Sequence, residues 1–355
     1  MALKKIFFPS ILIGCLLFVL FKNKNNNLVK REHSHDIELT TIKGLTMGTY
    51  YVVKYIDQTN PSISPNKIQD LIESDLDEIN RQMSTYIKDS EISKFNQLKS
   101  QDTFIISPWF QEVLSFSIKL TKKTFGYFDP TVGPLVNIWG FGPNKSKEIP
   151  DHKKIKETLS FVGIDKLVLN KDKISKKHPK LYLDLSSIAK GFAVDQLSTH
   201  LLELGLENHL IEIGGELKAH GYRNNDKNES WIIGIEKPIE KRSVHELIKL
   251  HNLSIATSGD YRNFTSTDSG NLTHTINPKT GRAISTDLVS VSLLAESCME
   301  ADAIATALLV MGQKKALQFA KEQQLATMFI TKTHEGALKT IITDSFKKWL
   351  VKKDS

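Results

Sequence analysis

The sequence predicts an α+β fold with a largely antiparallel sheet flanked by helices. Three observations support this class. Segments with helical spacing of apolar residues are mixed with short β-rich runs. From about Thr40 onward the chain has no internal repeat, low-complexity tract or long Pro/Gly/Ser linker. With 355 residues, of which 40% are hydrophobic and 25% charged, it can bury a large core in one or two domains.

The helices follow from apolar spacing and end signals. Residues 66–82 present apolar side chains on one face, and Ser107-Pro108 opens a helix that runs to about Lys122. The stretch 184–205 joins a strand end to a helix that Gly205 closes. Two more helices are predicted, one around residues 300–311 and a shorter one near 314–323. Strands are predicted at residues 49–56, 209–213, 231–235, 247–255 and 288–294, and in the C-terminal segment.

The N-terminus predicts a targeting segment over residues 1–21, followed by a polar linker at 22–40 and a single domain at 41–350. Lys4 and Lys5 precede an apolar run, in which Leu12-Ile13-Gly14-Cys15 resembles a bacterial lipobox. This places the protein at the cell inner membrane, lipid-anchored through Cys15 on the periplasmic side. Because residues 16–21 stay apolar, a single-pass N-terminal anchor with a periplasmic domain is the alternative.

The distribution of charge argues against a nucleic-acid-binding protein, and the cysteine content excludes a disulfide within the domain. The formal net charge is +7, but the lysines are spread along the chain without interleaved aromatic residues, so no nucleic-acid groove is indicated. Beyond Cys15 the chain has only Cys298, so no disulfide can form within the domain. We expect Cys298 to be a small buried hydrophobe.

The segment 300–306 carries the clearest chemical signal. Asp302 and Thr306 lie four residues apart in a predicted helix, so their oxygens share one face. The surrounding residues are mostly apolar, and a carboxylate on a largely buried helix needs a partner. Hard oxygen ligands favour Mg²⁺, or else Ca²⁺, over zinc. An Asp stabilised by the dipole of the helix N-terminus is the simpler interpretation.

Three other segments can each be interpreted either as part of a binding site or as ordinary local structure. The long segment 126–143 mixes Gly, Pro and aromatic residues, which can wall a planar ring or form an ordinary buried loop. Residues 184–191 lead into a helix N-terminus with Lys190, which can hold a phosphate, although Asp184 or Ser186 can equally be an N-cap. The Gly pair in residues 213–216 is best explained as a plain turn.

His274 precedes a Pro/Gly turn and is a candidate general base, because histidine titrates nearest neutral pH. Most single histidines have no such role. Arg262, Lys279 and Arg282 lie close to His274 in the sequence and supply cations suited to phosphates.

Taken together, these motifs resemble the ApbE family of FAD:protein FMN transferases. The matching segments appear in the family's order across nearly the whole chain after residue 40: residues 46–49, 83–86, 128–135, 184–191 and 213–216, the segments that begin at Ser258 and His274, and Glu300-Ala301-Asp302 with Thr306. The resemblance implies a T-fold-like domain that binds FAD and Mg²⁺. It implies that FAD is cleaved, that FMN is attached through a phosphoester to a Thr of a target protein, and that AMP is released.

The resemblance also implies roles for individual residues. His274 would accept the proton of the attacking hydroxyl. The metal would be held by Asp302, Thr306 and the backbone oxygen of Ser187, which stands where many relatives carry Ala. The FAD site would be lined by Met47, Tyr86, Tyr127, Phe128, Asp129, Asp184, Lys190 and Ile276.

Target proteins of the kind that the resemblance implies are subunits of membrane redox complexes, such as sodium-translocating NADH:quinone reductase (Nqr) or Rnf-type proteins. Two other functions stay open at this point. One is a Mg²⁺-dependent FAD pyrophosphatase that gives FMN and AMP. The other is a membrane-tethered flavin-binding lipoprotein without catalysis, although simple flavin binding requires neither a metal nor a base.

Overall fold

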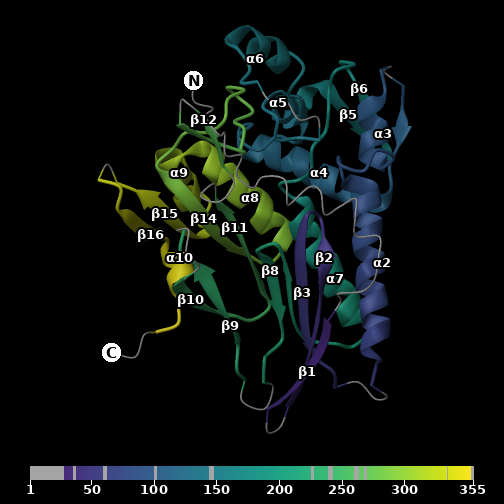
Figure 1. The fold of residues 1–355 in the computed structure, drawn as a ribbon, viewed down its shortest axis with the longest axis vertical. Helices are drawn as coiled ribbons and strands as arrows, with labels where there is room; N and C mark the ends of the chain where they lie inside the picture. The colour runs from purple at the N-terminus through teal and green to yellow at the C-terminus, as the bar shows by residue number, and fades with distance from the viewer. Residues whose placement is uncertain are drawn as a thin grey trace, which may run out of the picture.

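A computed structural model describes residues 28–34, 37–58, 62–99, 102–143, 148–224, 228–238, 243–259, 264–267, 270–333 and 335–352. Nine strands of these residues form one sheet, in the order β1-β2-β3-β7-β8-β11-β14-β15-β16 (Figure 1). Every neighbouring pair in it is antiparallel, which confirms the predicted fold class. The strands are β1 Leu28–Ser34, β2 Ile37–Thr46, β3 Thr49–Ile56, β7 Asn208–Ile213, β8 Glu216–His220, β11 Leu253–Gly259, β14 Leu288–Ala295, β15 Ala326–Lys332 and β16 Leu338–Ile342.

The remaining strands form three small sheets, and the helices are interspersed with strands along the chain until α10, which follows the last strand. The small sheets pair β4 Phe104–Ile105 and β5 Leu167–Asn170 with β6 Lys173–Lys176, β9 Trp231–Glu236 with β10 Val244–Leu250, and β12 Phe264–Thr267 with β13 Gly270–Thr273. The helices are α2 Pro65–Met83, α3 Glu91–Gln97, α4 Pro108–Lys123, α5 Gly133–Ile138, α6 His152–Leu159, α7 Ala189–Glu203, α8 Cys298–Met311, α9 Gln313–Glu322 and α10 Asp344–Lys347, with 3₁₀ turns at Pro130–Val132 and Ile164–Lys166.

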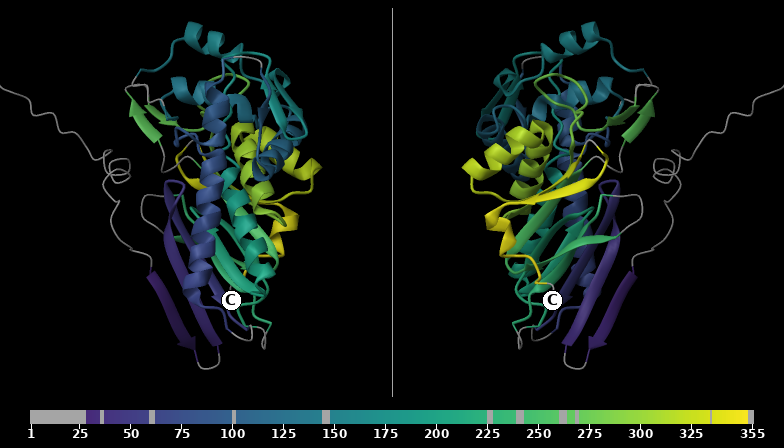
Figure 2. Two further views of the ribbon diagram at one scale, coloured as in Figure 1. Left: turned by 90° about the vertical axis from the view of Figure 1, so that its right-hand side faces the viewer. Right: turned by 90° about the vertical axis from the view of Figure 1, so that its left-hand side faces the viewer.

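The large sheet is covered on both faces. One face packs against α2, α4, α7, α8 and α9 in the main hydrophobic core, and the other packs against β9, β10 and α10. Strand β15 shows the alternation that makes this possible, because Phe329 joins the main core while Met328 and Ile330 join the second one. Figure 2 shows α2 lying lengthwise beside the strands at the N-terminal end of the sheet.

Several predicted elements are confirmed almost residue for residue. The strand predicted at 49–56 is β3, and the helices predicted at 66–82 and from Ser107 to Lys122 are α2 and α4. Helix α8 covers the predicted metal-binding helix, and Cys298 at its start is buried and free, as expected.

Other expectations need correction. Residues 247–255 are not one strand, because a turn at His251 and Asn252 separates β10 from β11, and Asn252 has a φ of 48° that strands do not allow. Residues 181–185 have no strand conformation. The segment 126–143 is only partly a loop, since it contains a 3₁₀ turn and α5. The sheet also extends into the predicted linker, because β1 and β2 begin before residue 40.

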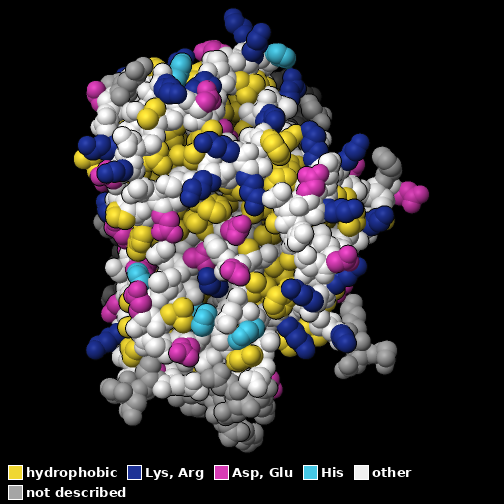
Figure 3. Space-filling model, turned by 180° about the vertical axis from the view of Figure 1, so that it is seen from behind, with side chains coloured by type: hydrophobic (Ala, Val, Ile, Leu, Met, Phe, Trp, Pro, Cys, Tyr) yellow, Lys and Arg dark blue, Asp and Glu magenta, His cyan; other side chains and the backbone are white. Residues whose placement is uncertain are grey.

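The predicted targeting segment, including Cys15, lies outside the described residues. Within the described ranges, no helix has both the length and the apolar content needed to cross a membrane. Figure 3 shows the face opposite to that of Figure 1, where Lys and Arg side chains gather toward the upper end of the molecule around exposed apolar side chains.

Candidate functional site

Three charged side chains from α7, β8 and α8 meet beneath the sheet face that carries the main core. The Lys190 Nζ lies 3.4 Å from Glu216 Oε1 and 3.8 Å from Asp302 Oδ2. Both carboxyl side chains are nearly inaccessible, with exposed fractions of 6% and 4%, whereas that of Lys190 is 26%. The Lys190 side chain is therefore partly exposed, while its ammonium group faces two carboxyl groups that are almost closed to solvent.

The local sequence explains how Asp302 comes to be buried with partners. Helix α8 is apolar on nearly every side, so its one buried carboxylate must be paired. The backbone N–H of Gly191 donates to Asp302 Oδ2 at 3.1 Å. This contact is possible because Gly191 lets the two helices approach: a Cβ at this position would lie 2.8 Å from Met299 Cα.

The charges of this cluster are unbalanced when both carboxyl groups are ionised. Burial raises the pKa of Glu216 to about 8, although Lys190 opposes the shift. Burial also raises the pKa of Asp302, against the effects of Lys190 and the Gly191 amide. For Lys190, burial opposes the charged form, but Asp302 and Glu216 outweigh it and raise the pKa of the ammonium. One ammonium thus faces two carboxyl groups, and the Glu216 Oε2 atom is buried without a hydrogen-bond partner.

This donor set fits a hard divalent cation. Asp302 supplies a carboxylate, Thr306 supplies a hydroxyl one turn further along α8, and Ser187 lies in the turn just before α7. Oxygen ligands of these kinds suit Mg²⁺, which keeps several waters and needs few protein groups. Among the described residues no three His, Cys, Asp or Glu side chains gather as a metal site, so any site here depends on hydroxyl, carbonyl or ligand oxygens. Thr306 Oγ1 shares a 3.0 Å hydrogen bond with Ser258 Oγ on β11.

Asp129 and Asp184 lie on segments that are bonded to each other. The Asp184 N–H donates to the Pro130 carbonyl at 2.8 Å, next to Asp129. Each carboxylate closes a local turn: Asp129 Oδ1 accepts from the Thr131 N–H and hydroxyl, and Asp184 Oδ1 accepts from those of Ser186. Burial raises the pKa of Asp129. Neither Asp184 nor Ser186 is the N-cap of α7, since that position is Ile188.

Tyr127 is held between two lysines. The Nζ atoms of Lys279 and Lys315 lie 4.9 Å and 5.1 Å from its ring centre, and Lys315 donates to its hydroxyl. Lys279 also donates to the Phe125 carbonyl at 3.0 Å, which ties the turn after His274 to the aromatic segment. The neighbouring Phe128 is buried in the main core.

Ile276 and α5 form a separate small cluster. Ile276 packs with Leu135 and Val162, and Trp139 Nε1 donates to the Gly281 carbonyl at 2.8 Å. The segments 126–143 and 274–284, far apart in the sequence, therefore make one wall. Ile276 itself is only 5% exposed, so its side chain belongs mainly to the packed interior of this cluster.

The remaining predicted residues lie on three other segments. Met47 lies in the two-residue turn between β2 and β3, with a φ of 50° that is rare for a residue with a side chain. Tyr86 is 65% exposed, and its hydroxyl donates to the Phe141 carbonyl at 3.1 Å. His274 is exposed at the start of the 274–284 segment. Arg262 lies outside the described residues.

The sequence profile of the ApbE family matches residues 47–329. The chain belongs to the ApbE family. Curated relatives named FAD:protein FMN transferase include one from Vibrio cholerae, 43% identical over 89% of this chain and 94% of its own, and one from Haemophilus influenzae, 43% identical over 88% of this chain and 92% of its own. The flavin transferase ApbE structure from Vibrio cholerae superimposes with a TM-score of 0.81 at 41% identity, covering 88% of this chain and all of that one.

Within this ApbE chain, two residues of the site, Glu216 and Ser258, had no predicted role. Glu216 follows the Gly214–Gly215 turn, which is a plain hairpin turn as predicted. The burial of Glu216 could not be predicted, because it depends on the packing of β8 under α7. Ser258 was part of a recognised motif but had no assigned role until its bond to Thr306. The sequence signal that could have identified Glu216 is an ionisable residue at the start of a strand with apolar neighbours.

A depression in the surface of the ApbE domain contains none of the predicted site residues. It has a volume of about 620 Å³ and runs along α2. Its lining is mostly acidic: Asp70, Glu73, Ser74, Asp75, Asp77, Glu78, Arg81 and Trp109.

Proposed function

We propose that this protein is a Mg²⁺-dependent FAD:protein FMN transferase that attaches FMN to a Thr hydroxyl of a target protein. Membership of the ApbE family and identity of 43% to transferases over nearly the whole chain support the transfer reaction. The observation that carries the metal-dependent step is the buried cluster of Lys190, Glu216 and Asp302, in which two carboxyl groups share one ammonium.

The reaction balances as a phosphoryl transfer. The Thr oxygen forms a bond to the phosphorus of the FMN half of FAD, the bond from that phosphorus to the bridging oxygen breaks, and AMP leaves with that oxygen. The proton of the Thr hydroxyl goes to His274, because a neutral imidazole can accept a proton. When bound, Mg²⁺ neutralises charge on the pyrophosphate oxygens.

In this proposal each residue has a defined task. Lys190 presents its ammonium to the phosphates, and Asp302, Thr306 and the Ser187 carbonyl hold the metal. The turn at Met47, the Tyr86 ring and the wall built from segments 126–143 and 274–284 bind the rest of FAD. Asp129 and Asp184 fix the backbone between these parts through their turns.

The target and the location are further parts of the proposal. Flavinylated subunits of membrane redox complexes of the Nqr or Rnf type match the chemistry of the transfer. An N-terminal anchor, through a lipid on Cys15 or a single pass, would place the domain in the periplasm beside such complexes.

The test is to incubate the protein with FAD, Mg²⁺ and a Thr-containing target subunit, with and without chelator. Intact-mass spectrometry of the target and quantification of AMP are the readouts. A chelator-sensitive FMN mass shift with AMP release supports the transferase. Release of FMN and AMP without a shift supports the pyrophosphatase instead, and bound, uncleaved FAD supports a carrier.

A further inference from the structure

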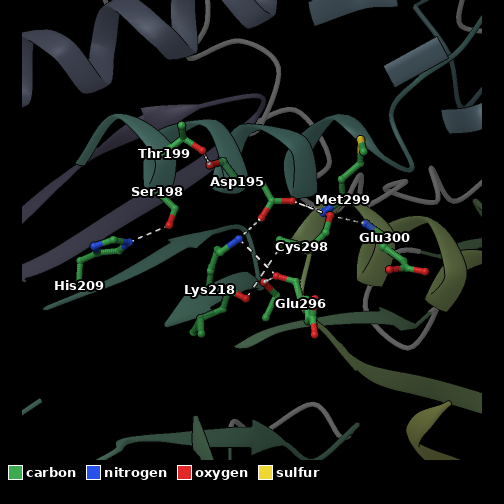
Figure 4. Close-up of polar contacts among 12 residues, drawn as sticks. Asp195, Ser198, Thr199, His209, Lys218, Glu296, Cys298, Met299 and Glu300 are labelled. Carbon is green, nitrogen blue, oxygen red and sulfur yellow. Dashed lines mark hydrogen bonds and ion pairs between the residues drawn. The ribbon is translucent and has the colours of Figure 1, made fainter. Parts of the chain in front are cut away.

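Asp195 joins three elements next to the site, yet the proposed reaction assigns it no task. It lies on α7, and its Oδ1 accepts from Lys218 Nζ on β8 at 2.6 Å. Its Oδ2 accepts from the Ser297 hydroxyl at 2.8 Å. The same oxygen accepts from the Met299 N–H at 2.9 Å (Figure 4). Both Oδ2 donors belong to the start of α8, the helix that carries Asp302 and Thr306.

These contacts make Asp195 part of the N-terminal cap of α8. Ser297 is the N-cap residue, and its Oγ accepts from the Glu300 N–H at 3.2 Å. Asp195 orients that hydroxyl and satisfies the Met299 amide, one of the N–H groups that a helix start leaves unpaired. A carboxylate at this end also interacts favourably with the helix dipole. Lys218 offsets its charge in a setting where both side chains are less than a fifth exposed.

The same face of α7 contacts α8 at a second point that belongs to the site. Gly191 lies one turn before Asp195, on the same side of α7, and its N–H donates to Asp302. On β8, Glu216 and Lys218 are two residues apart and therefore face the same way, toward Lys190 and Asp195. The position of α8 along α7, and with it the place of Asp302 beside Lys190, thus depends on two linked contacts.

We propose that Asp195 is a positioning residue, which fixes the first turn of α8 against α7 and so sets Asp302 and Thr306 in their place for binding the metal. The metal part of this proposal rests on the proposed function. An ionised carboxylate is needed because its two oxygens accept from three donors. In Asp195→Asn, an NH₂ group replaces one of these oxygens and faces a hydrogen-bond donor, so at least one of the three hydrogen bonds is lost.

Ser198 provides a matched control on the same helix. Its hydroxyl shares a 2.8 Å hydrogen bond with His209 Nε2, which ties α7 to β7 and does not involve α8 (Figure 4). Ser198→Ala therefore removes a buried polar contact of α7 without touching the α8 cap. Ser297→Ala removes the N-cap hydroxyl while leaving Asp195 in place, and it keeps the proposal testable where Asp195→Asn does not fold.

The first readout requires no substrate. Hydrogen–deuterium exchange of peptides covering 297–306 is compared in the whole protein and in the three variants, without FAD or Mg²⁺. We expect protection of this stretch to fall by roughly tenfold in Asp195→Asn and by a few-fold in Ser297→Ala, since each loses part of the cap. Ser198→Ala is expected to retain it. Wild-type protection in both cap variants overturns the proposal.

The second readout is the Mg²⁺ concentration that gives half-maximal FMN transfer, measured beside the KM for FAD. We expect this Mg²⁺ concentration to rise by about 10- to 100-fold in Asp195→Asn, as found for residues that orient metal ligands, while the KM for FAD changes less. Equal Mg²⁺ dependence in Asp195→Asn and Ser198→Ala would mean that the contact is only structural. If the wild-type protein transfers no FMN, the proposed function fails, and the exchange experiment alone decides the role of Asp195.

Discussion

At the scale of single residues, the site is defined by two buried carboxyl groups that share one ammonium. Sequence reasoning placed Asp302 on a buried helix and predicted that it needs a partner, which is correct. In the structure Lys190 and the Gly191 amide contact Asp302, and a metal at this carboxylate stays a prediction. The unpaired Glu216 oxygen shows that these partners do not satisfy the whole cluster.

The substitution Glu216→Gln removes the charge of this side chain from the cluster while keeping its size and shape. We expect FMN transfer at pH 8 to fall by about 10- to 100-fold, because Lys190 loses one of its two carboxylate partners. Thermal stability at this pH should be held or raised, since a folded-state pKa raised to about 8 means that ionising the buried Glu216 costs stability as the pH rises. Unchanged transfer in the variant would show that Glu216 only fills space.

His209 makes stability depend on pH in the opposite direction. It is fully buried between the Ser198 hydroxyl and the Leu206 carbonyl, and burial lowers the pKa of its imidazole to about 4. Below about pH 6.5, His209 therefore binds a proton in the unfolded chain but not in the folded protein. The stability that the neutral His209 contributes is complete above that pH and is lost as the pH falls toward 4.

The contribution of His209 can reach about 3 kcal/mol. It is measured from urea unfolding between pH 4 and 7.5, with His209→Asn for comparison. The variant should be less stable at neutral pH but should lose less stability on acidification. Parallel pH profiles for the two proteins would contradict this assignment.

At the scale of elements, the site depends on how closely α7 and α8 approach. Gly191→Ala tests this directly, because the added Cβ meets the backbone of Cys298 and Met299, which cannot move aside as a side chain can. We expect a loss of about 1–3 kcal/mol in the free energy of unfolding, measured by chemical denaturation, together with a higher Mg²⁺ requirement.

Gly234→Ala on β9 is the matched control. There the nearest atom to an added Cβ is a Val244 methyl carbon at 3.1 Å, which can adjust. A Gly191→Ala variant as stable as Gly234→Ala would show that the helices have room to separate.

The elements also show which sequence signals suffice. Helices α2 and α4 were predictable because apolar spacing and a Pro in the first turn agree. The turn between β10 and β11 was missed because Asn252, unlike Gly, gives only a weak sequence signal for a left-handed residue. The pattern Ser297-x-x-Glu300 was a capping signature from which the start of α8 could have been read.

At the scale of the whole molecule, the sequence predicted an antiparallel sheet with helices but could not give the strand order. Placing β8 between β7 and β11, under α7 and α8, requires contacts between segments far apart in the chain. For this reason Asp302 and Lys190 were recognised separately, while their meeting with Glu216 was not foreseen. The single domain predicted for residues 41–350 stays a prediction, although β1 and β2 of the sheet begin before residue 41.

The most direct test compares wild-type protein, Asp302→Ala and Ser198→Ala by intact-mass spectrometry of a Thr-containing target, with saturating FAD and Mg²⁺. The account predicts a chelator-sensitive FMN mass shift with the wild-type and Ser198→Ala proteins. It predicts no shift with Asp302→Ala, whose far-ultraviolet circular dichroism should remain that of a folded protein. Transfer by folded Asp302→Ala at the wild-type rate would contradict the assignment of this cluster as the site of the reaction.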